Sequence, residues 1–136
     1  MNTAPIKTNY RGAAFRDLDL TGRDFTNADF RPITDTSPFP TGDRIIRSDF
    51  TSTVLAGAVL VGARASRAIF DGTDLTAANC AGADLSQVYA PSACFIRADL
   101  TGADFTGADL TGADFTGATT TDAIFTHANL TGTRGL

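Results

Sequence analysis

Tryptophan and glutamate are absent from this chain of 136 residues, and histidine, methionine and lysine occur once each. The two cysteines, Cys80 and Cys94, make neither a disulfide framework nor a CxxC metal-binding pair. A zinc site has almost no ligands to draw on, because His127 is the single imidazole. We therefore expect two reduced thiols and neither a metal nor a cofactor.

The sequence also lacks long apolar runs and targeting signals. No apolar run reaches the roughly 18 residues of a membrane span. No charged and then apolar leader ends at a small-residue cleavage site. These absences predict a soluble, cytoplasmic protein that does not contact a membrane.

Groups that could perform catalysis are equally sparse. His127 is expected in a turn that faces solvent, and no serine or cysteine has a visible base partner. No phosphate-binding loop or metal-ligand spacing appears, and calcium-binding nonapeptide repeats would need GGxGxD motifs. The sequence therefore predicts a protein that is not an enzyme.

What the sequence does have is a repeat of five residues, clearest in ADLTGADFTGADLTGADFTGA at residues 98–118. Nine of the ten phenylalanines lie at multiples of five, and twelve of the thirteen glycines lie two positions after this register. A small residue, usually alanine, lies two positions before it. The large residues that share the register are the predicted core: Phe15, Leu20, Phe25, Phe30, Phe50, Leu55, Leu60, Phe70, Leu75, Leu85, Phe95, Leu100, Phe105, Leu110, Phe115, Phe125 and Leu130.

A period of five fits neither one face of an α-helix nor a long half-buried strand. It fits a very short strand followed by a corner, because residues two apart on a strand point to the same side. The small and large residues then point inward and the aspartate between them points outward. The Thr-Gly pair forms a type II turn, whose third position requires a positive φ. Repetition of this unit winds the chain into a coil.

From about Arg11 to the C-terminus, the ADLTG and ADFTG units resemble the pentapeptide-repeat family, whose pattern is A(D/N)LXX. The resemblance implies an all-β fold, a right-handed quadrilateral parallel β-helix in which four pentapeptides form each coil. Residues 1–136 would then make a single domain of about six coils. Residues 1–10 are expected to form an N-terminal cap or tail.

Residues 31–47 lose the repeat and contain three of the five prolines. Proline removes a donor from a strand ladder, so this composition predicts an irregular loop or insertion. The segment either completes an irregular coil or leaves the solenoid and returns; we favour the extruded loop. Ile45 lies on the inward register and is expected to be able to rejoin the core.

All fifteen acidic residues are aspartates. Residues 1–67 carry a net charge of +2 and residues 68–136 carry −6, so the second half is acidic. In a four-sided coil successive aspartates face four directions, whereas residues 20 apart stack in columns. One expected column is Arg44, Arg64, Asp84 and Asp104. The candidate partner-binding carboxylates are Asp84, Asp99, Asp104, Asp109 and Asp114, although aspartate is also the commonest residue at this position of the repeat.

Apolar residues replace aspartate at several outward positions near the middle of the chain, at Val54, Val59 and Ile69. Tyr89 is expected to stack above Ile69, 20 residues later. Exposed apolar groups at one level of a rod can mark a partner site, or they can be scattered surface aliphatics. Ile69 and Tyr89 are therefore candidate partner-binding residues.

Two functions fit these features. The first is a rigid scaffold that binds another protein and performs no chemistry. The second follows from the resemblance: some pentapeptide-repeat proteins mimic DNA and bind DNA gyrase or topoisomerase IV, which are type II topoisomerases. An acidic rod can compete for surfaces that otherwise bind phosphates. Direct nucleic acid binding is not expected in either case.

The oligomeric state follows from the ends of a solenoid, which leave strand edges unpaired. Nothing after Leu130 is long enough to cover the last coil. A homodimer formed by end-to-end stacking of coils is therefore a further hypothesis.

Overall fold

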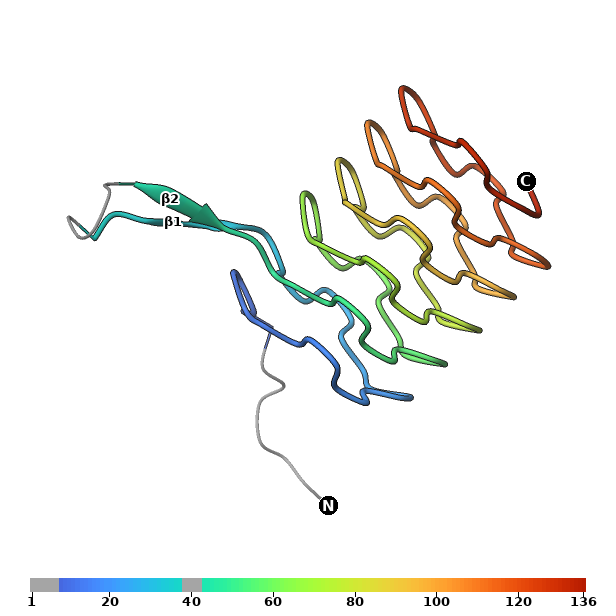
Figure 1. Ribbon diagram of the computed structural model, residues 1–136. Helices are drawn as coiled ribbons and strands as arrows, with labels where there is room; N and C mark the ends of the chain where they lie inside the picture. Colours follow the sequence, from blue (N-terminus) through green and yellow to red (C-terminus); the bar gives the residue numbers. More distant parts are fainter. Residues whose placement is uncertain (1–7, 38–42) are drawn as a thin grey trace, which may run out of the picture.

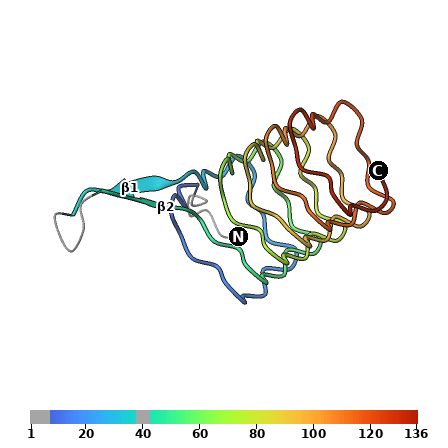
Figure 2. The same ribbon diagram turned by 45° about the horizontal axis from the view of Figure 1, so that its top comes forward.

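The computed structural model describes residues 8–37 and 43–136, which wind into a stack of flat coils with one arm projecting from its side (Figure 1). The turned view shows the coils stacked one behind another, with their corners aligned along the rod (Figure 2). No helix in these two ranges is long and apolar enough to cross a membrane.

Each pentapeptide forms one short strand and one turn. In the unit at Leu100, the N–H of Ala103 donates to the carbonyl of Leu100 at 3.0 Å, and Gly102 between them has a φ of 67°. This positive φ at the third turn position, with a closing hydrogen bond, is the geometry of a type II turn. Leu100 in turn donates its N–H to Thr119 of the next coil at 2.8 Å, so the coils pair as parallel strands.

The outward residues of these strands stack in four columns, each named here by one member. The Asp84 column is Asn9, Asp29, Arg64, Asp84, Asp104 and Ile124. The Tyr89 column is Ala14, Asp49, Ile69, Tyr89, Asp109 and Asn129. The Asp114 column is Asp19, Val54, Asp74, Cys94, Asp114 and Arg134, and the Asp99 column is Asp24, Val59, Asn79, Asp99 and Thr119.

The described residues of the arm are 32–37 and 43–47. Its two strands, β1 (Ile33–Asp35) and β2 (Arg44–Ile46), pair antiparallel, with Ile33 opposite Ile46 and Asp35 opposite Arg44. Strand partners on either side of the arm, such as Ala14 and Asp49, are 35 residues apart, whereas partners elsewhere, such as Asp49 and Ile69, are 20 apart. Of the two alternatives for this segment, its described residues adopt the extruded one.

Two expectations about this segment are wrong. Ile45 does not rejoin the core but is 54% exposed on β2, because Ile45 lies on the outer face of a ribbon that has left the solenoid. Arg44 is absent from the column of Asp84 for the same reason: the chain returns to the solenoid only after the arm. Asp29 takes the place below Arg64 instead.

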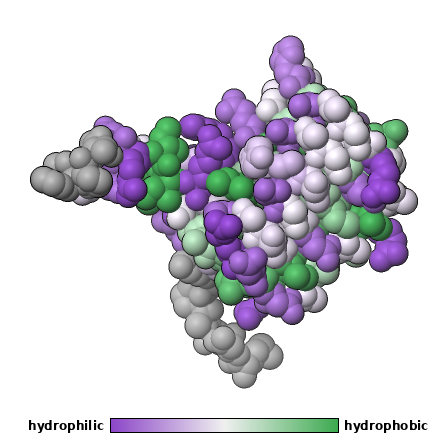
Figure 3. All heavy atoms as spheres, in the orientation of Figure 1, coloured by the Kyte–Doolittle hydropathy of each residue, from purple (hydrophilic) through white to green (hydrophobic). Residues whose placement is uncertain are grey.

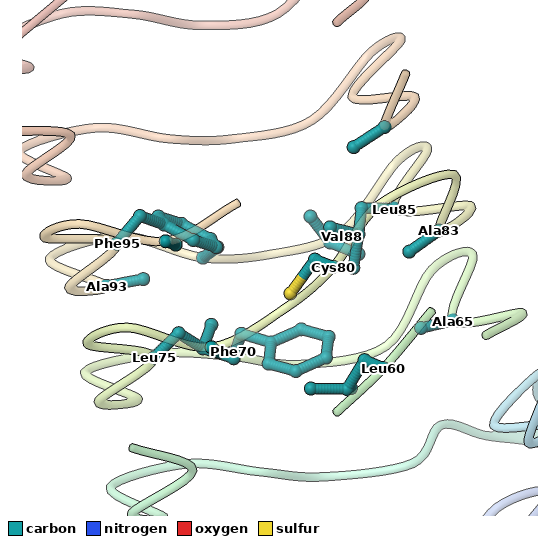
Figure 4. Packing of buried hydrophobic residues seen from close by; sticks show 14 of the residues in the cluster. Leu60, Ala65, Phe70, Leu75, Cys80, Ala83, Leu85, Val88, Ala93 and Phe95 are labelled. Atoms are coloured by element: carbon teal, nitrogen blue, oxygen red, sulfur yellow. The ribbon is translucent and has the colours of Figure 1, made fainter. Parts of the chain in front are cut away.

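The interior of the solenoid is filled by the predicted large residues and the alanines between them (Figure 4). Aromatic rings stack along the axis: Phe50 lies 4.7 Å from Phe70 with an interplanar angle of 5°, and Phe95 lies 5.0 Å from Phe115. Such stacked pairs add about 0.5–1.5 kcal/mol beyond the area they bury. The buried apolar residues from Phe25 to Phe115 form one cluster, so the solenoid has a single core.

The end coils are less buried than predicted. Phe15, Leu20 and Phe125 are only partly buried against the core, and Leu130 is 37% exposed, because each has a covering layer on one side only. At the other end, Asn9 and Tyr10 already belong to the first coil, where Tyr10 stacks on Phe30. The remainder of the expected cap or tail, residues 1–7, lies outside the described residues.

Three buried polar side chains occupy inward positions where the repeat normally has alanine: Ser48, Thr53 and Thr73. Each donates its hydroxyl to a main-chain carbonyl of the coil below; Thr73, for example, bonds to Phe50 at 2.7 Å. Burial of these hydroxyls is thereby compensated.

Candidate interaction surfaces

The aspartates of the repeat accept hydrogen bonds that stabilise the turns of the solenoid, in addition to placing charge on its surface. Oδ1 of Asp99 accepts both the N–H of Thr101 at 3.0 Å and its hydroxyl at 2.6 Å. The same pair of bonds links Asp104 to Thr106 and Asp109 to Thr111. Each aspartate therefore closes an Asx turn at the start of its corner.

These hydrogen bonds also stabilise the charged form of the carboxylates. The Thr101 hydroxyl, followed by the Thr101 N–H, holds the pKa of Asp99 below its ordinary value of 3.8. The Thr116 hydroxyl and N–H act in the same way on the pKa of Asp114, with a smaller contribution from Arg134. Because hydrogen bonds to a carboxylate favour its ionised form, Asp99 and Asp114 stay charged further into the acidic range than free aspartate does.

The five predicted carboxylates are distributed around the rod. Asp84 and Asp104 are direct neighbours in one column, whereas Asp99, Asp109 and Asp114 each belong to a different column. All five are half-buried. In the described residues, no column has more than two aspartates in succession, so the carboxylates form no continuous acidic stripe.

The predicted stacking of Tyr89 above Ile69 is confirmed by their parallel pairing. Tyr89 is 43% exposed, and Ile69 below it is half-buried. The pair is bounded in its column by Asp49 and Asp109.

The base of the arm is held by arginines on the first coils. Arg11 donates to the carbonyl of Pro32 at 2.7 Å, and Arg31 forms a two-pronged pair with Asp29, both bonds being 2.9 Å. Along the arm, Arg44 pairs with Asp35 at 2.7 Å. Figure 3 shows hydrophobic surface on the arm beside these polar groups, where β1 and β2 contribute isoleucines.

Two recesses lie near the first coils. A polar recess of about 540 Å³ is lined by Thr8, Asn9, Asn27, Asp29, Gly62 and Arg64. A second, of about 300 Å³, lies at the open end of the first coil and is lined by Tyr10, Phe15, Leu20, Arg23, Asp24 and Phe25. Within residues 8–37 and 43–136, no group of three or more histidine, cysteine or aspartate side chains could hold a metal ion.

The remaining reactive side chains are isolated from one another. His127 lies at an exposed turn position with a φ of 59°. Cys80 is buried, and this burial raises the pKa of its thiol to about 12. Cys94 is half-buried in an outward column, with its sulfur 3.2 Å from the hydroxyl of Thr76.

Several surface residues that flank Tyr89 were not singled out from the sequence. Gln87, Pro91 and Ser92 occupy corner positions on either side of Tyr89, where the coil above has Gly107, Thr111 and Gly112. The available signal was the interruption SQVYAPSACFIR at residues 86–97, which lies just before the most regular repeats in the chain.

Comparison with known proteins places this geometry in a group of related folds. HetL, a pentapeptide repeat protein involved in heterocyst differentiation regulation in the cyanobacterium Nostoc sp. strain PCC 7120, matches with 27% identity and a TM-score of 0.66. The match covers 95% of this chain and 54% of HetL, so the chain spans about half the length of that protein.

Two further solved structures are similar. A thylakoid-lumen pentapeptide repeat protein of Arabidopsis thaliana is 30% identical, with a TM-score of 0.39, over 91% of this chain and 66% of that protein. A variant of QnrB1, a plasmid-mediated fluoroquinolone resistance protein, is 18% identical, with a TM-score of 0.40, over 94% of this chain and 68% of that protein. Comparison with curated proteins finds no significant match.

The family described as Pentapeptide repeats matches the sequence in eight copies, within residues 46–79, 53–89, 68–107 and 93–132. These residues include most of the parallel columns, the stacked core and the Asx turns. The chain therefore belongs to the pentapeptide-repeat family.

Proposed function

We propose that this protein is a rigid module that binds another protein through its outer surface and performs no chemistry of its own. The observation that carries the proposal is the difference between the inward and the outward positions of each repeat. The inward positions are filled by a continuous apolar core, while the varied side chains lie on the corners, the outward columns and the arm. A scaffold of this kind presents a fixed surface at little entropic cost on binding.

The involvement of HetL in the regulation of heterocyst differentiation is compatible with such a module. The proposal extends to this chain only the class of function, binding, and not the partner. The dispersal of the reactive side chains supports it further, because nucleophilic catalysis needs a nucleophile and its base within hydrogen-bond reach.

The second candidate function is a DNA mimic that binds a type II topoisomerase. The charge distribution favours this function less than it favours general protein binding. B-form DNA presents closely spaced phosphates along its whole length. Here the Asp114 column alternates aspartates with Val54, Cys94 and Arg134, and Arg64 interrupts the Asp84 column. In addition, one oxygen of each of the five predicted carboxylates accepts hydrogen bonds from the residue two positions later. This residue is a threonine in four cases and Ser86 in the case of Asp84.

Two experiments test the proposal together. Immobilised folded protein is exposed to a lysate of the source organism, and any retained protein is purified and titrated calorimetrically against the free chain. We expect a stoichiometric complex with micromolar or tighter affinity. The absence of any protein that binds in the purified system would contradict a binding role.

The second experiment is a gyrase supercoiling assay with and without a quinolone. We expect neither inhibition nor protection at micromolar protein. Inhibition that weakens in the Asp84→Asn, Asp104→Asn double variant would instead support mimicry, because asparagine removes the charge and retains the turn bond.

A further inference from the structure

The coil that contains Tyr89 departs from the repeat on its outside as well as on its inside, where Val88 takes the place of the usual alanine and Ala90 that of the large residue. The inward residues Val88, Ala90, Ala93 and Phe95 are all at most 2% exposed, like their counterparts in other coils. The outward residue Tyr89 and its corner neighbours do not follow the repeat. Because these inward residues remain buried and Tyr89 lies at an outward position, burial in the core does not account for the tyrosine.

The departure also carries a conformational cost. Gln87 and Ser92 have φ values of 54° and 56°, a region that favours glycine, and the coil above has Gly107 and Gly112 at the same positions. Tyr89 cannot close an Asx turn, whereas Asp109 directly above it does. Eight other described non-glycine corner residues adopt a similar positive φ, so the solenoid imposes this conformation and the change of surface side chains is what distinguishes this coil.

The apolar part of this surface is a small platform made by Ile69, Tyr89 and Pro91, which we call the Tyr89 platform. Ile69 lies beneath Tyr89 in its column, and Pro91 lies at the adjoining corner of the same coil. Tyr89 is the most exposed of the three, and no hydrogen bond occupies its hydroxyl within the described ranges. Tyrosine with a free hydroxyl on a rigid support is typical of the residues that dominate binding energy at interfaces.

Carboxylates border the platform on two sides. Asp109 is the strand neighbour above Tyr89, about 4.8 Å away along the rod. Its Oδ1 is fixed by Thr111, at 3.0 Å from the N–H and 2.6 Å from the hydroxyl, and this orients Oδ2 as an acceptor. Asp71 lies at the corner directly below Pro91. Neither carboxylate forms an ion pair with any residue that the structure describes.

We propose that the Tyr89 platform is the docking site for an extended segment of a partner protein that has an apolar side chain within two residues of an arginine or lysine. The apolar side chain packs on Tyr89, Ile69 and Pro91, and the cation reaches Asp109 or Asp71. Adjacent residues of an extended segment are about 3.3 Å apart, so a separation of one or two residues matches the spacing between the ring and the carboxylate. The proposal rests on the proposed binding function and identifies where on the rod it resides.

The test uses a library of random 12-residue peptides displayed on phage and selected against the full-length folded protein. We expect enrichment of sequences in which a large apolar residue lies within two residues of arginine or lysine. Synthetic peptides of the selected sequence should bind with an affinity that falls at least tenfold for Tyr89→Ala and several-fold for Asp109→Asn, measured by fluorescence anisotropy at low salt.

A matched control is Asp19→Asn, which removes the same charge and keeps the same turn bonds, to Thr21, in a neighbouring column at the first coil. This variant should bind the peptide as the wild type does. The circular dichroism spectrum and melting curve of each variant establish that it is folded, which is expected because Tyr89 makes no core contact from its outward position.

Two results would overturn the site. Selection that yields no such motif excludes the platform as a peptide-docking surface. Selected peptides that bind the Tyr89→Ala variant unchanged show that the surface lies elsewhere. The second result leaves the protein-binding function intact, whereas failure of the function itself would appear as loss of every partner in the calorimetric experiment.

Discussion

At the scale of single residues, the corners of the solenoid hold their third residue at a positive φ. Among the residues that the structure describes, twelve glycines and ten others have a positive φ, and all but Gly135 lie at the third position of a turn. The conformation therefore comes from the coil, since strand pairing on both sides of the corner holds even Arg97 and Ala77 in it. Glycine relieves a strain that the solenoid otherwise imposes.

This strain can be measured by opposite substitutions at equivalent corners. Gly102→Ala introduces a Cβ into open space at a φ of 67°, so the only cost is conformational, about 1 kcal/mol. Ala77→Gly, at a φ of 57°, should remove the strain and leave the protein equally or slightly more stable, because the added freedom of the unfolded chain offsets part of the gain. Chemical denaturation followed by circular dichroism measures both, and equal destabilisation by the two changes would contradict the assignment.

The Asx turns give a second prediction at this scale. Asp99→Asn keeps an acceptor for Thr101, as Asn129 does for Thr131 at 3.1 and 2.7 Å, and should leave the melting temperature at pH 7 nearly unchanged. Asp99→Ala removes both bonds and should lower the melting temperature by a few degrees. A loss of stability in the asparagine variant as large as in the alanine variant would mean that the charge, and not the turn, is what matters.

Acid should destabilise the protein through the same groups. The pKa values of Asp19, Asp24, Asp99 and Asp114 are held below 3.8 in the folded chain, chiefly by the threonine hydroxyls. The unfolded chain therefore binds protons more readily, and the stabilisation is complete above about pH 4 and is lost as the pH falls through the folded values. Melting curves should be flat between pH 7 and 5 and should shift to lower temperature below pH 4; a maximum of stability at pH 3 would contradict this linkage.

At the scale of elements, the arm is an insertion that the solenoid accommodates without a change of register. The separation between paired residues rises from 20 to 35 across it, so the arm replaces one ordinary corner with 15 additional residues. Arg31 still receives the usual corner bond from Gly12, at 3.2 Å. Gly12 also has Ile33 and the carbonyl of Ile46 so close that a Cβ would lie 2.8 and 3.3 Å from them.

Deletion of residues 32–46 should therefore leave a folded solenoid. The deletion joins Arg31 to Arg47 and places Asp29 and Asp49 five positions apart, which is the normal spacing of the repeat. We expect a cooperative melt within several degrees of the wild type. Aggregation or loss of the β signal would show that the arm is needed for folding, contrary to its position outside the core.

The way the arm is attached can be tested separately. Gly12→Ala must displace Ile33, whereas Gly22→Ala, with a similar φ of 68°, meets no atom within 4 Å. The first should be more destabilising than the second by an amount that reflects the contact with the arm alone. Combining Gly12→Ala with the deletion of residues 32–46 should reduce its cost to that of Gly22→Ala, and an unchanged difference would contradict the proposed contact.

At the scale of the whole molecule, the single apolar cluster should make the rod open as a unit. Cys80 reports on this, because it is 1% exposed between Leu60 and Leu100 in the same inward row and burial raises the pKa of its thiol to about 12. A thiol reagent should label one cysteine, Cys94, in the native protein and the second only in denaturant. Labelling of both at similar rates in the native state would show that the coils open independently.

The sequence by itself determined the repeat, the core and the corners. One large inward residue every five positions leaves a single way to bury them together, and this local rule applies to the interior from Phe25 to Phe115. The same rule failed at Leu130, because burial at the end of a stack depends on whether a further layer covers it. It also failed at Ile45. The position of Ile45 is a multiple of five, but it lies on the arm, outside the solenoid, and is exposed.

Only the tertiary structure decided which residues stand above one another. A column joins residues 20 or 35 positions apart, and the insertion of the arm shifts only the pairs that span it, so Asp29 and not Arg44 lies below Arg64. The structure likewise showed the role of the aspartates. From the sequence of the repeat alone, a carboxylate that closes a turn cannot be distinguished from one that contacts a partner. The short-range rule of the strand and corner can be predicted from five residues, whereas neighbours across the rod depend on the path of the whole chain.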